Sequence, residues 1–456
     1  MSTRDEIASP SYKRDLGNGF VVRWSERRDA AAIAELCGYV FRSAAADPPN
    51  RSVMAWIGDA MSGRHPHTGP GDHAVVEEVS SGRIVSSAFL LSYEVDLEGA
   101  GVPFGRPEAV ATHPDYRNRG FVRAIFELLH ARSEARGHLI QGITGIRYYY
   151  RLFGYEYAAD LGGQINVPFT SIPPLEPGKT EPYTLRGASA SDLPLALELY
   201  ERDCARYALT ARISAEYWRW VAFGQDRASG EGWTTRMIVD AAGTTVGYAA
   251  TATARHSDEI ALHALNLREG TSLASVLPSL LRGLVAVSGE PLPRKQGLPA
   301  PSRVALGLGR EHPVYRLLTE AQCQGVRRAP AYAWYLRVPD VPKLLLLMRD
   351  TLAARLAGSP VAGYTGELRL TFYPGGLRLL FAGGRLESVE RWREDHAWGP
   401  RAQAGFPPHV FLKLVFGYRS LAELGESYPD VTANDEARPL LEALFPPRAT
   451  MLKPLD

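Results

Sequence analysis

Short runs in which apolar and polar residues alternate dominate the first part of the chain, and this period of two predicts strands. Runs of this kind cover residues 20–24, 74–79, 83–97 and 107–113. Glycine-containing turns separate the last three runs, which predicts an antiparallel meander. The next segment, 121–136, places its apolar residues at helical spacing on one face, so we expect a helix there.

A proline-rich stretch at residues 168–182 interrupts this pattern and predicts a linker. After it the same order of elements recurs: a strand, a helix that begins at Asp192, an aromatic segment, three strands and a helix over 272–287. This recurrence predicts an internal structural repeat. From residue 341 the order changes to a helix, three strands joined by Gly-Gly turns, and further helices, which predicts a third, α+β unit.

The chain of 456 residues is too long for one hydrophobic core, because single cores rarely grow beyond about 250 residues. We therefore expect an α/β (α+β) protein with mixed, mostly antiparallel sheets. Its expected parts are an N-terminal tail (1–19), a first unit (20–167), a linker (168–182), a second unit (183–338) and a third unit with a C-terminal tail (339–456).

Composition and charge are those of an ordinary globular protein, with 22% charged residues, 45% hydrophobic residues and a formal net charge of +1. This balance argues against a nucleic-acid binder, so any anion site must be local. The three cysteines, Cys37, Cys204 and Cys323, are odd in number and form no CxxC pair, which indicates a reducing compartment and no zinc site. A polar start and the absence of a long apolar stretch predict a cytoplasmic protein with no membrane partner.

The sequence DYRNRG, residues 115–120, joins the last strand of the meander to the predicted helix. The first N–H groups of a helix have no intrahelical acceptor, and the helix dipole is positive at that end. With Arg117 and Arg119 nearby, and with Gly120 allowing close approach, the turn could bind a pyrophosphate. The alternative is a solvated basic turn that simply opens an amphipathic helix.

Residues 110–129 resemble the segment that GCN5-related N-acetyltransferases (GNATs) place around the pyrophosphate of coenzyme A: a strand, a bend, (Arg/Gln)-x-x-Gly-x-(Gly/Ala) and a helix. Val122 departs from the last position of that motif. The chain is similar to the enhanced-intracellular-survival (Eis-like) branch of this family, which has a bulky residue at the same position. That branch also has a run like YRLFGY, which forms residues 150–155 of this chain.

The Eis-like resemblance implies an organisation for the whole chain. Proteins of that branch consist of two tandem GNAT folds followed by a domain similar to sterol carrier protein 2, and residues 370–391 and 406–424 look like parts of that last domain. The branch forms hexamers, so a homo-oligomer is implied. The second unit has no counterpart of the DYRNRG turn, and we expect it to bind no cofactor.

The resemblance also implies roles for single residues. Backbone groups of Val110 and Thr112 would bind the pantetheine arm and the acetyl carbonyl of acetyl-CoA. The residues implied at the pyrophosphate are Arg117, Asn118, Arg119 and Gly120, with the N–H groups of Phe121 and Val122 as additions.

Two catalytic roles follow in the same way. Tyr150 would be the general acid that protonates the departing thiolate, although several of the tyrosines at 148, 149, 150, 155 and 157 must only be packing. The carboxylate at Asp456 would be the general base, and the alternative is a frayed terminus.

These features together predict an acetyl-CoA-dependent N-acetyltransferase that acts without a metal. The implied acceptor is a primary amine, either a small molecule of the aminoglycoside or polyamine kind or a lysine side chain, which attacks directly in a ternary complex. The rival hypothesis is a non-catalytic protein that senses acyl-CoA or binds a lipid.

Overall fold

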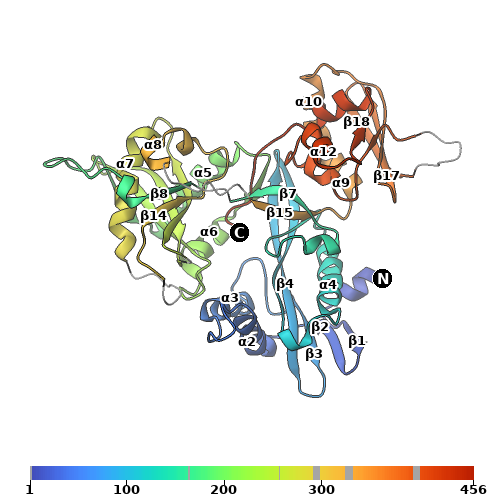
Figure 1. The fold of residues 1–456 in the computed structure, drawn as a ribbon, viewed down its shortest axis with the longest axis horizontal. Coiled ribbons are helices and arrows are strands. Elements are labelled where there is room, and N and C mark those ends of the chain that lie inside the picture. The colour runs from blue at the N-terminus through green and yellow to red at the C-terminus, as the bar shows by residue number, and fades with distance from the viewer. Residues whose placement is uncertain are drawn as a thin grey trace.

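The computed structural model describes residues 3–162, 165–255, 257–290, 298–323, 332–393 and 401–455. Three lobes surround the C-terminal end of the chain, and each lobe is built on its own β-sheet (Figure 1). The mixed α/β architecture with mostly antiparallel sheets confirms the predicted fold class.

The sheet of the first lobe contains the predicted meander, in which β3, β4 and β5 pair antiparallel in chain order. The next pair, β5 and β6, is parallel. The path through this sheet is β1 (Lys13–Gly17), β2 (Phe20–Trp24), β3 (His73–Glu78), β4 (Arg83–Leu97), β5 (Ala100–Thr112), β6 (Ile140–Ile143), β15 (Tyr332–Arg337) and β7 (Glu156–Leu161).

Helices cover both faces of this sheet (Figure 1). One face packs against α4 (Phe121–Ala135), whose buried residues include Ile125 and Leu128, as its apolar stripe predicts. The short α1 (Thr3–Ala8) lies beside α4. The other face packs against α2 (Ala30–Val40) and faces the second lobe. Helix α3 (Arg51–Met61) packs against α2.

The second lobe repeats this plan. Its sheet follows the path β8 (Ile165–Pro168), β14 (Arg303–Leu306), β13 (Glu259–Leu267), β12 (Thr245–Ala252), β11 (Trp233–Asp240) and β9 (Tyr183–Gly187). Three of these strands, β11 to β13, again form an antiparallel meander, and a parallel pair, β13 with β14, follows. Helices α5 (Leu193–Cys204) and α7 (Leu273–Ala286) occupy the chain positions of α2 and α4.

Sheet membership differs from the sequence-based division at several strands, of which β15, β8 and β1 lie on the main paths of the sheets. Strand β15, expected within the second unit, lies between β6 and β7 of the first sheet, and β8, which straddles the expected end of the first unit, pairs with β14 of the second sheet. Strand β1 forms an edge of the first sheet although its residues were expected in a tail. Pairing between residues so far apart in the chain leaves no local pattern in the sequence that would predict it.

The third lobe has a sheet with the order β18 (Arg385–Trp392), β17 (Gly376–Ala382), β16 (Gly366–Thr371), β19 (Ala404–Gly405) and β20 (Thr432–Ala433). Helices α9 (Val341–Leu347) and α10 (Arg349–Ala357) pack on β18, and α10 also contacts α13 (Ala437–Leu444). Two shorter helices, α11 (Phe411–Val415) and α12 (Leu421–Ser427), precede α13.

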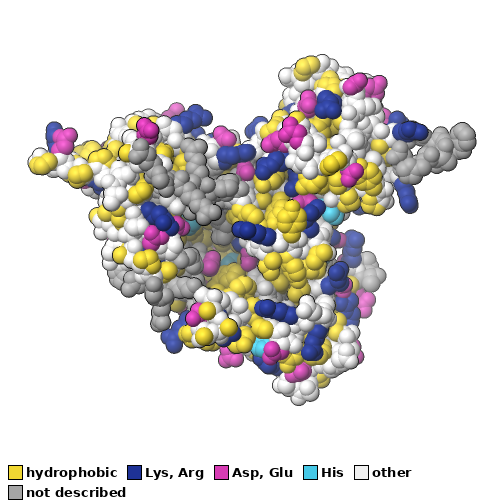
Figure 2. Space-filling view, viewed as in Figure 1, with side chains coloured by type: hydrophobic (Ala, Val, Ile, Leu, Met, Phe, Trp, Pro, Cys, Tyr) yellow, Lys and Arg dark blue, Asp and Glu magenta, His cyan; other side chains and the backbone are white. Residues whose placement is uncertain are grey.

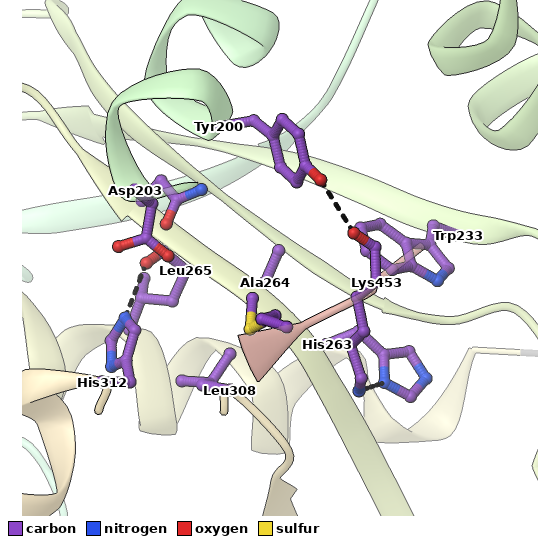
Figure 3. A pocket seen from close by; sticks show the side chains of 11 residues that line it. Tyr200, Asp203, Trp233, His263, Ala264, Leu265, Leu308, His312 and Lys453 are labelled. Carbon is purple, nitrogen blue, oxygen red and sulfur yellow. Dashed lines mark hydrogen bonds between the residues drawn. The ribbon is translucent and has the colours of Figure 1, made fainter. Parts of the chain in front are cut away.

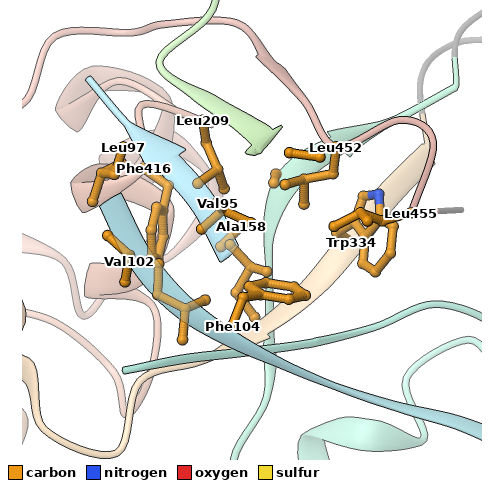
Figure 4. Packing of buried hydrophobic residues seen from close by; sticks show 14 of the residues in the cluster. Val95, Leu97, Val102, Phe104, Ala158, Leu209, Trp334, Phe416, Leu452 and Leu455 are labelled. Atoms are coloured by element: carbon orange, nitrogen blue, oxygen red, sulfur yellow. The ribbon is translucent and has the colours of Figure 1, made fainter. Parts of the chain in front are cut away.

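The C-terminal segment joins the lobes. Its strand β21 (Thr450–Met451) pairs with β10 (Leu209–Arg212), which in turn pairs with β4 of the first sheet. Leu452 and Leu455 are 1% and 0% exposed, and they lie in one apolar cluster with residues of all three lobes (Figure 4). Within the described residues, every helix is too short or too polar to cross a bilayer.

Candidate active site

The centre of the first sheet splits where β5 and β6 separate. The two strands pair only at Phe104 with Ile140 and at Gly105 with Gln141, although β5 continues to Thr112. A bulge interrupts the β4–β5 register just beyond this point, and Ala109 has a left-handed φ of 49°. The far end of β5 therefore has one edge paired with β4 and one open edge.

Thr112 presents its carbonyl group to that open edge. The next residue, His113, donates its backbone N–H to the carbonyl of Val85 in β4, so the carbonyl of Thr112 points the other way. There the Nε of Arg117 approaches the Thr112 oxygen at 3.4 Å. Val110 lies in the same unpaired stretch, next to the bulge. Both residues thus lie where an extended ligand could add to the sheet as a strand does.

The turn after β5 leaves backbone N–H groups exposed. A short 3-10 helix (Pro114–Tyr116) leads into Asn118 and Gly120, which have φ values of 63° and 78°, and α4 begins at Phe121. Gly120 is the N-cap and has no side chain to accept from the first turn of α4, so those N–H groups remain available. A Cβ at Gly120 would meet nothing within 4 Å, so the site is open to a ligand.

Arginines surround this turn. The Arg119 guanidinium lies over the Tyr116 ring at 5.2 Å and bonds the backbone oxygen of Asp115 at 3.4 Å. Burial, together with the nearby Arg83 and Arg117 charges, lowers the pKa of His113. Positive charge and open N–H groups therefore coincide at the N-terminus of α4, which is a suitable environment for a pyrophosphate.

Tyr150 lies beside the open edge. It begins a short 3-10 helix (Tyr150–Phe153), is only 4% exposed and packs with Phe126 and Tyr335, whose ring centroids are 5.8 Å and 5.4 Å from its own. Val110 and Val122 pack against the same cluster. The structure therefore brings together Tyr150, the end of β5 and the first turn of α4.

Burial raises the pKa of Tyr150, and the nearby Glu108 carboxylate raises it further. The phenol consequently stays protonated at neutral pH, as a proton donor must. The neighbouring tyrosines have other contacts: Tyr155 bonds His130 at 3.0 Å, and the Tyr157 hydroxyl accepts from the Tyr148 N–H at 2.9 Å. These contacts fit the expected packing roles.

Glu108 is a candidate that the sequence reasoning missed. It precedes the bulge residue Ala109, its side chain is 15% exposed, and its carboxylate binds Arg106 and accepts from the Ala109 N–H at 2.9 Å. A signal was available, because two charged residues within a strand of the sheet centre are expected only when they are paired or functional.

Comparison with known proteins identifies the kind of domain that forms most of the first lobe. Residues 22–158, from β2 to β7, match the family model described as an acetyltransferase (GNAT) domain. These residues are a GNAT acetyltransferase domain. The protein is therefore an acyltransferase. No curated protein sequence matches the chain significantly.

Solved structures share the fold over nearly the whole chain. The chain is similar to a GCN5-related N-acetyltransferase from Kribbella flavida, with a TM-score of 0.64, 17% identity and coverage of 95% of this chain and 97% of that one. A probable N-acyltransferase from Enterococcus faecalis gives a TM-score of 0.64 at 14% identity, covering 97% and 99% of the two chains. Eis1 from Mycobacterium abscessus gives 0.56 at 16% identity, covering 93% and 97%.

The GNAT domain meets the second lobe and the C-terminal segment on the face opposite α4. Tyr93 of β4 lies 3.4 Å from Tyr217 between their hydroxyl oxygens, and the Tyr217 hydroxyl donates to the Pro454 carbonyl at 3.3 Å. The ring of His67 lies 4.4 Å from that of Tyr93, and burial lowers the pKa of His67 to about 4. Burial raises the pKa of Tyr93, while the nearby Arg106 charge lowers it and the Glu108 charge raises it.

A recess between the second lobe and the GNAT domain contains acidic and histidine side chains (Figure 2). Asp456, the other residue that the resemblance implies for catalysis, lies outside the described residues, and the residue before it, Leu455, is fully buried. In the described part of the chain, no three His, Cys, Asp or Glu side chains form a group that could bind a metal ion.

Proposed function

We propose that the GNAT domain transfers the acetyl group of acetyl-CoA to a primary amine by direct attack in a ternary complex. The observation that carries this proposal is the open edge of β5, which runs into an exposed, arginine-flanked helix N-terminus with Tyr150 beside it. The open strand edge suits the amide groups of a pantetheine arm, and the helix N-terminus that follows it suits the diphosphate at the other end of that arm.

The turn would bind the diphosphate through the N–H groups of residues 118–122 and through the side chains of Arg117 and Arg119. Thr112 and Val110 would pair with the amide groups of the pantetheine arm. The thioester would then lie next to Tyr150, because Val110 packs against the Tyr150 cluster.

In the reaction the amine nitrogen attacks the thioester carbonyl carbon, and the carbon–sulfur bond breaks. The phenol of Tyr150 donates its proton to the departing thiolate, and a carboxylate accepts the proton that the amine loses. Glu108 is one candidate for that carboxylate because of its place beside the split, and Asp456 is the other, from the resemblance.

The acceptor class also comes from the Eis-like resemblance: an aminoglycoside-like or polyamine molecule, or a lysine side chain. We likewise propose a third lobe related to sterol carrier protein 2 and a homo-oligomer, a hexamer by resemblance. What supports the organisation is a fold shared along the chain with Eis1 of Mycobacterium abscessus. Location in the cytoplasm stays a prediction from the sequence.

A thiol-release assay with acetyl-CoA and a panel of amines tests the proposal. We expect Tyr150→Phe to lower kcat by about tenfold or more while the Kd for acetyl-CoA stays unchanged. Tyr149→Phe is the matched control, since that neighbouring ring packs against the same cluster. Acetyl-CoA binding without thiol release for any amine would instead favour the rival acyl-CoA sensor.

A further inference from the structure

The second lobe contains a split of the same kind as the GNAT domain. Strands β13 and β14 pair in parallel from Glu259 with Arg303 to Leu262 with Leu306. Beyond that point β13 continues to Leu267, paired with β12 on its other edge. This arrangement corresponds to β5 and β6, which also separate after a short parallel pairing. In the second lobe, the C-terminal segment of the chain lies against this split.

Lys453 reaches the point at which the two strands separate. Its Nζ donates to the Gly307 carbonyl at 2.9 Å. It also donates to Nδ1 of His263 at 2.8 Å (Figure 3). Gly307 directly follows β14, and His263 directly follows the last paired residue of β13. The Lys453 residue is only 8% exposed, so its ammonium group is held in the protein interior.

The rest of the segment fits the same pocket. The Tyr200 hydroxyl donates to the Lys453 carbonyl at 2.9 Å. A Cβ at Gly309 would lie 2.6 Å from the Met451 sulfur, so Met451 packs directly on that backbone. The cavity that remains has a volume of about 10 Å³, which is room for about one water molecule.

A buried ammonium is costly unless its hydrogens are accepted, and here a carbonyl oxygen and an imidazole nitrogen accept them. For His263 to accept at Nδ1, its proton must be on Nε2, and the ring is held by stacking on Trp233 at 5.7 Å. These groups suit a primary alkylammonium, whose three hydrogens point in different directions.

We propose that this pocket of the second lobe is a lysine-ammonium site that Lys453 occupies in cis, and that it positions residues 449–455 beside the acceptor side of the GNAT domain. The adjacent Pro454 carbonyl accepts from Tyr217, which contacts Tyr93 near Glu108. The second half of this inference rests on the proposed function, whereas the site itself does not.

Hydrogen exchange measured by mass spectrometry on the full chain tests the site. In Lys453→Met, which keeps the apolar stem and removes the ammonium, we expect amides of residues 449–455 to exchange at least tenfold faster. Lys343→Met, at an exposed position in α9, is the matched control and should leave that exchange unchanged. In Lys453→Ala, added propylammonium should restore protection, and propanol should not.

The possible outcomes distinguish the lysine-ammonium site from its role in positioning residues 449–455. Wild-type exchange in Lys453→Met would overturn the site; should that variant fail to fold, His263→Phe, which removes one acceptor, gives the same test. Faster exchange with an unchanged kcat would overturn the positioning role, and faster exchange with a lower kcat at constant KM for acetyl-CoA would support it. If wild type releases no thiol with any amine, the proposed function fails while the exchange data still decide the site.

Discussion

At the scale of single residues, the split in the sheet brings two ionisable side chains, Tyr150 and Glu108, close together, and the proposed reaction gives them opposite tasks. Tyr150 lies in an apolar cluster, where burial keeps its phenol protonated. The Glu108 side chain instead binds Arg106 and accepts from the Ala109 N–H. A proton donor and a proton acceptor set apart by their surroundings are what amine acetylation requires.

Replacing Glu108 tests its role as the base. We expect Glu108→Gln to lower kcat by about 100-fold at neutral pH, because the amine then has no carboxylate to accept its proton. The loss should shrink as pH rises toward the pKa of the amine, since the free base no longer needs deprotonation. Glu94→Gln, on an exposed part of β4, is the control. An unchanged pH–rate profile would leave Asp456 as the carboxylate to test.

A second residue-scale prediction concerns stability in acid. His73 in β3 is fully buried, stacks on Phe89 at 4.6 Å, and neither ring nitrogen has a hydrogen-bond partner among the described residues. Burial lowers its pKa to about 3, whereas the unfolded chain binds this proton near pH 6.5. The unfolded state therefore gains a proton first, and the free energy of unfolding falls as pH drops from about 6.5 toward 3.

The slope for one such proton is about 1.4 kcal/mol per pH unit. His73→Phe should remove this contribution and flatten the decline in the free energy of unfolding, measured by urea titration between pH 7 and pH 4. His65 and His67, whose pKa values burial lowers to about 3 and about 4, should keep part of the decline in the variant. Parallel pH curves for the variant and wild type would contradict this account.

At the scale of secondary structure, local patterns in the sequence were enough to predict the elements that build the proposed coenzyme site. The meander, the amphipathic helix and the intervening turn all depend on residues close together in the chain, and the structure contains them as β3 to β5, α4 and residues 113–120. The bulge at Ala109 was not foreseen, because it follows from how β4 and β5 pair rather than from a local signal.

Helix α4 allows a matched test of the turn. Glycines at its two ends, Gly120 and Gly137, have φ values of 78° and 77°, and a Cβ at either would meet nothing within 4 Å. Alanine at each position should therefore cost a similar free energy of unfolding, about 1 kcal/mol, through backbone strain alone.

Only Gly120→Ala should also weaken acetyl-CoA binding, because only that glycine borders the open N–H groups. Isothermal titration calorimetry on both variants measures this, and the expected increase in Kd is about fivefold or more for Gly120→Ala. Equal affinities would show that the turn does not approach the diphosphate.

At the scale of the whole molecule, the main feature that local patterns could not reveal is the exchange of strands between lobes. Strand β15 completes the first sheet from residues 332–337, and β8 completes the second sheet from residues 165–168. The predicted boundaries divide the chain into consecutive segments, whereas the first two sheets each include a strand from another segment. The same limitation applies to Lys453, whose acceptors lie almost 150 residues or more away in the chain.

This exchange makes the GNAT domain dependent on the rest of the chain. Strand β15 lies between β6 and β7, and its Trp334, Tyr335 and Leu336 are at most 1% exposed. A fragment of residues 1–162 would lack this strand and would expose the edges of β6 and β7 together with the apolar surface that Trp334 covers. We expect the fragment alone to be aggregated or unfolded, without a cooperative urea transition.

Co-expression with a fragment of residues 165–456 should restore the fold, because it supplies β15 in trans. The measurement is recovery of a soluble complex in which the amides of β6 are protected from hydrogen exchange. The control is a second fragment in which Trp334 and Leu336 are both replaced by Asp, so that the strand cannot be buried between β6 and β7. A cooperative transition of residues 1–162 by themselves would show that the first sheet closes without the exchanged strand, and the lobes would then be independent folding units.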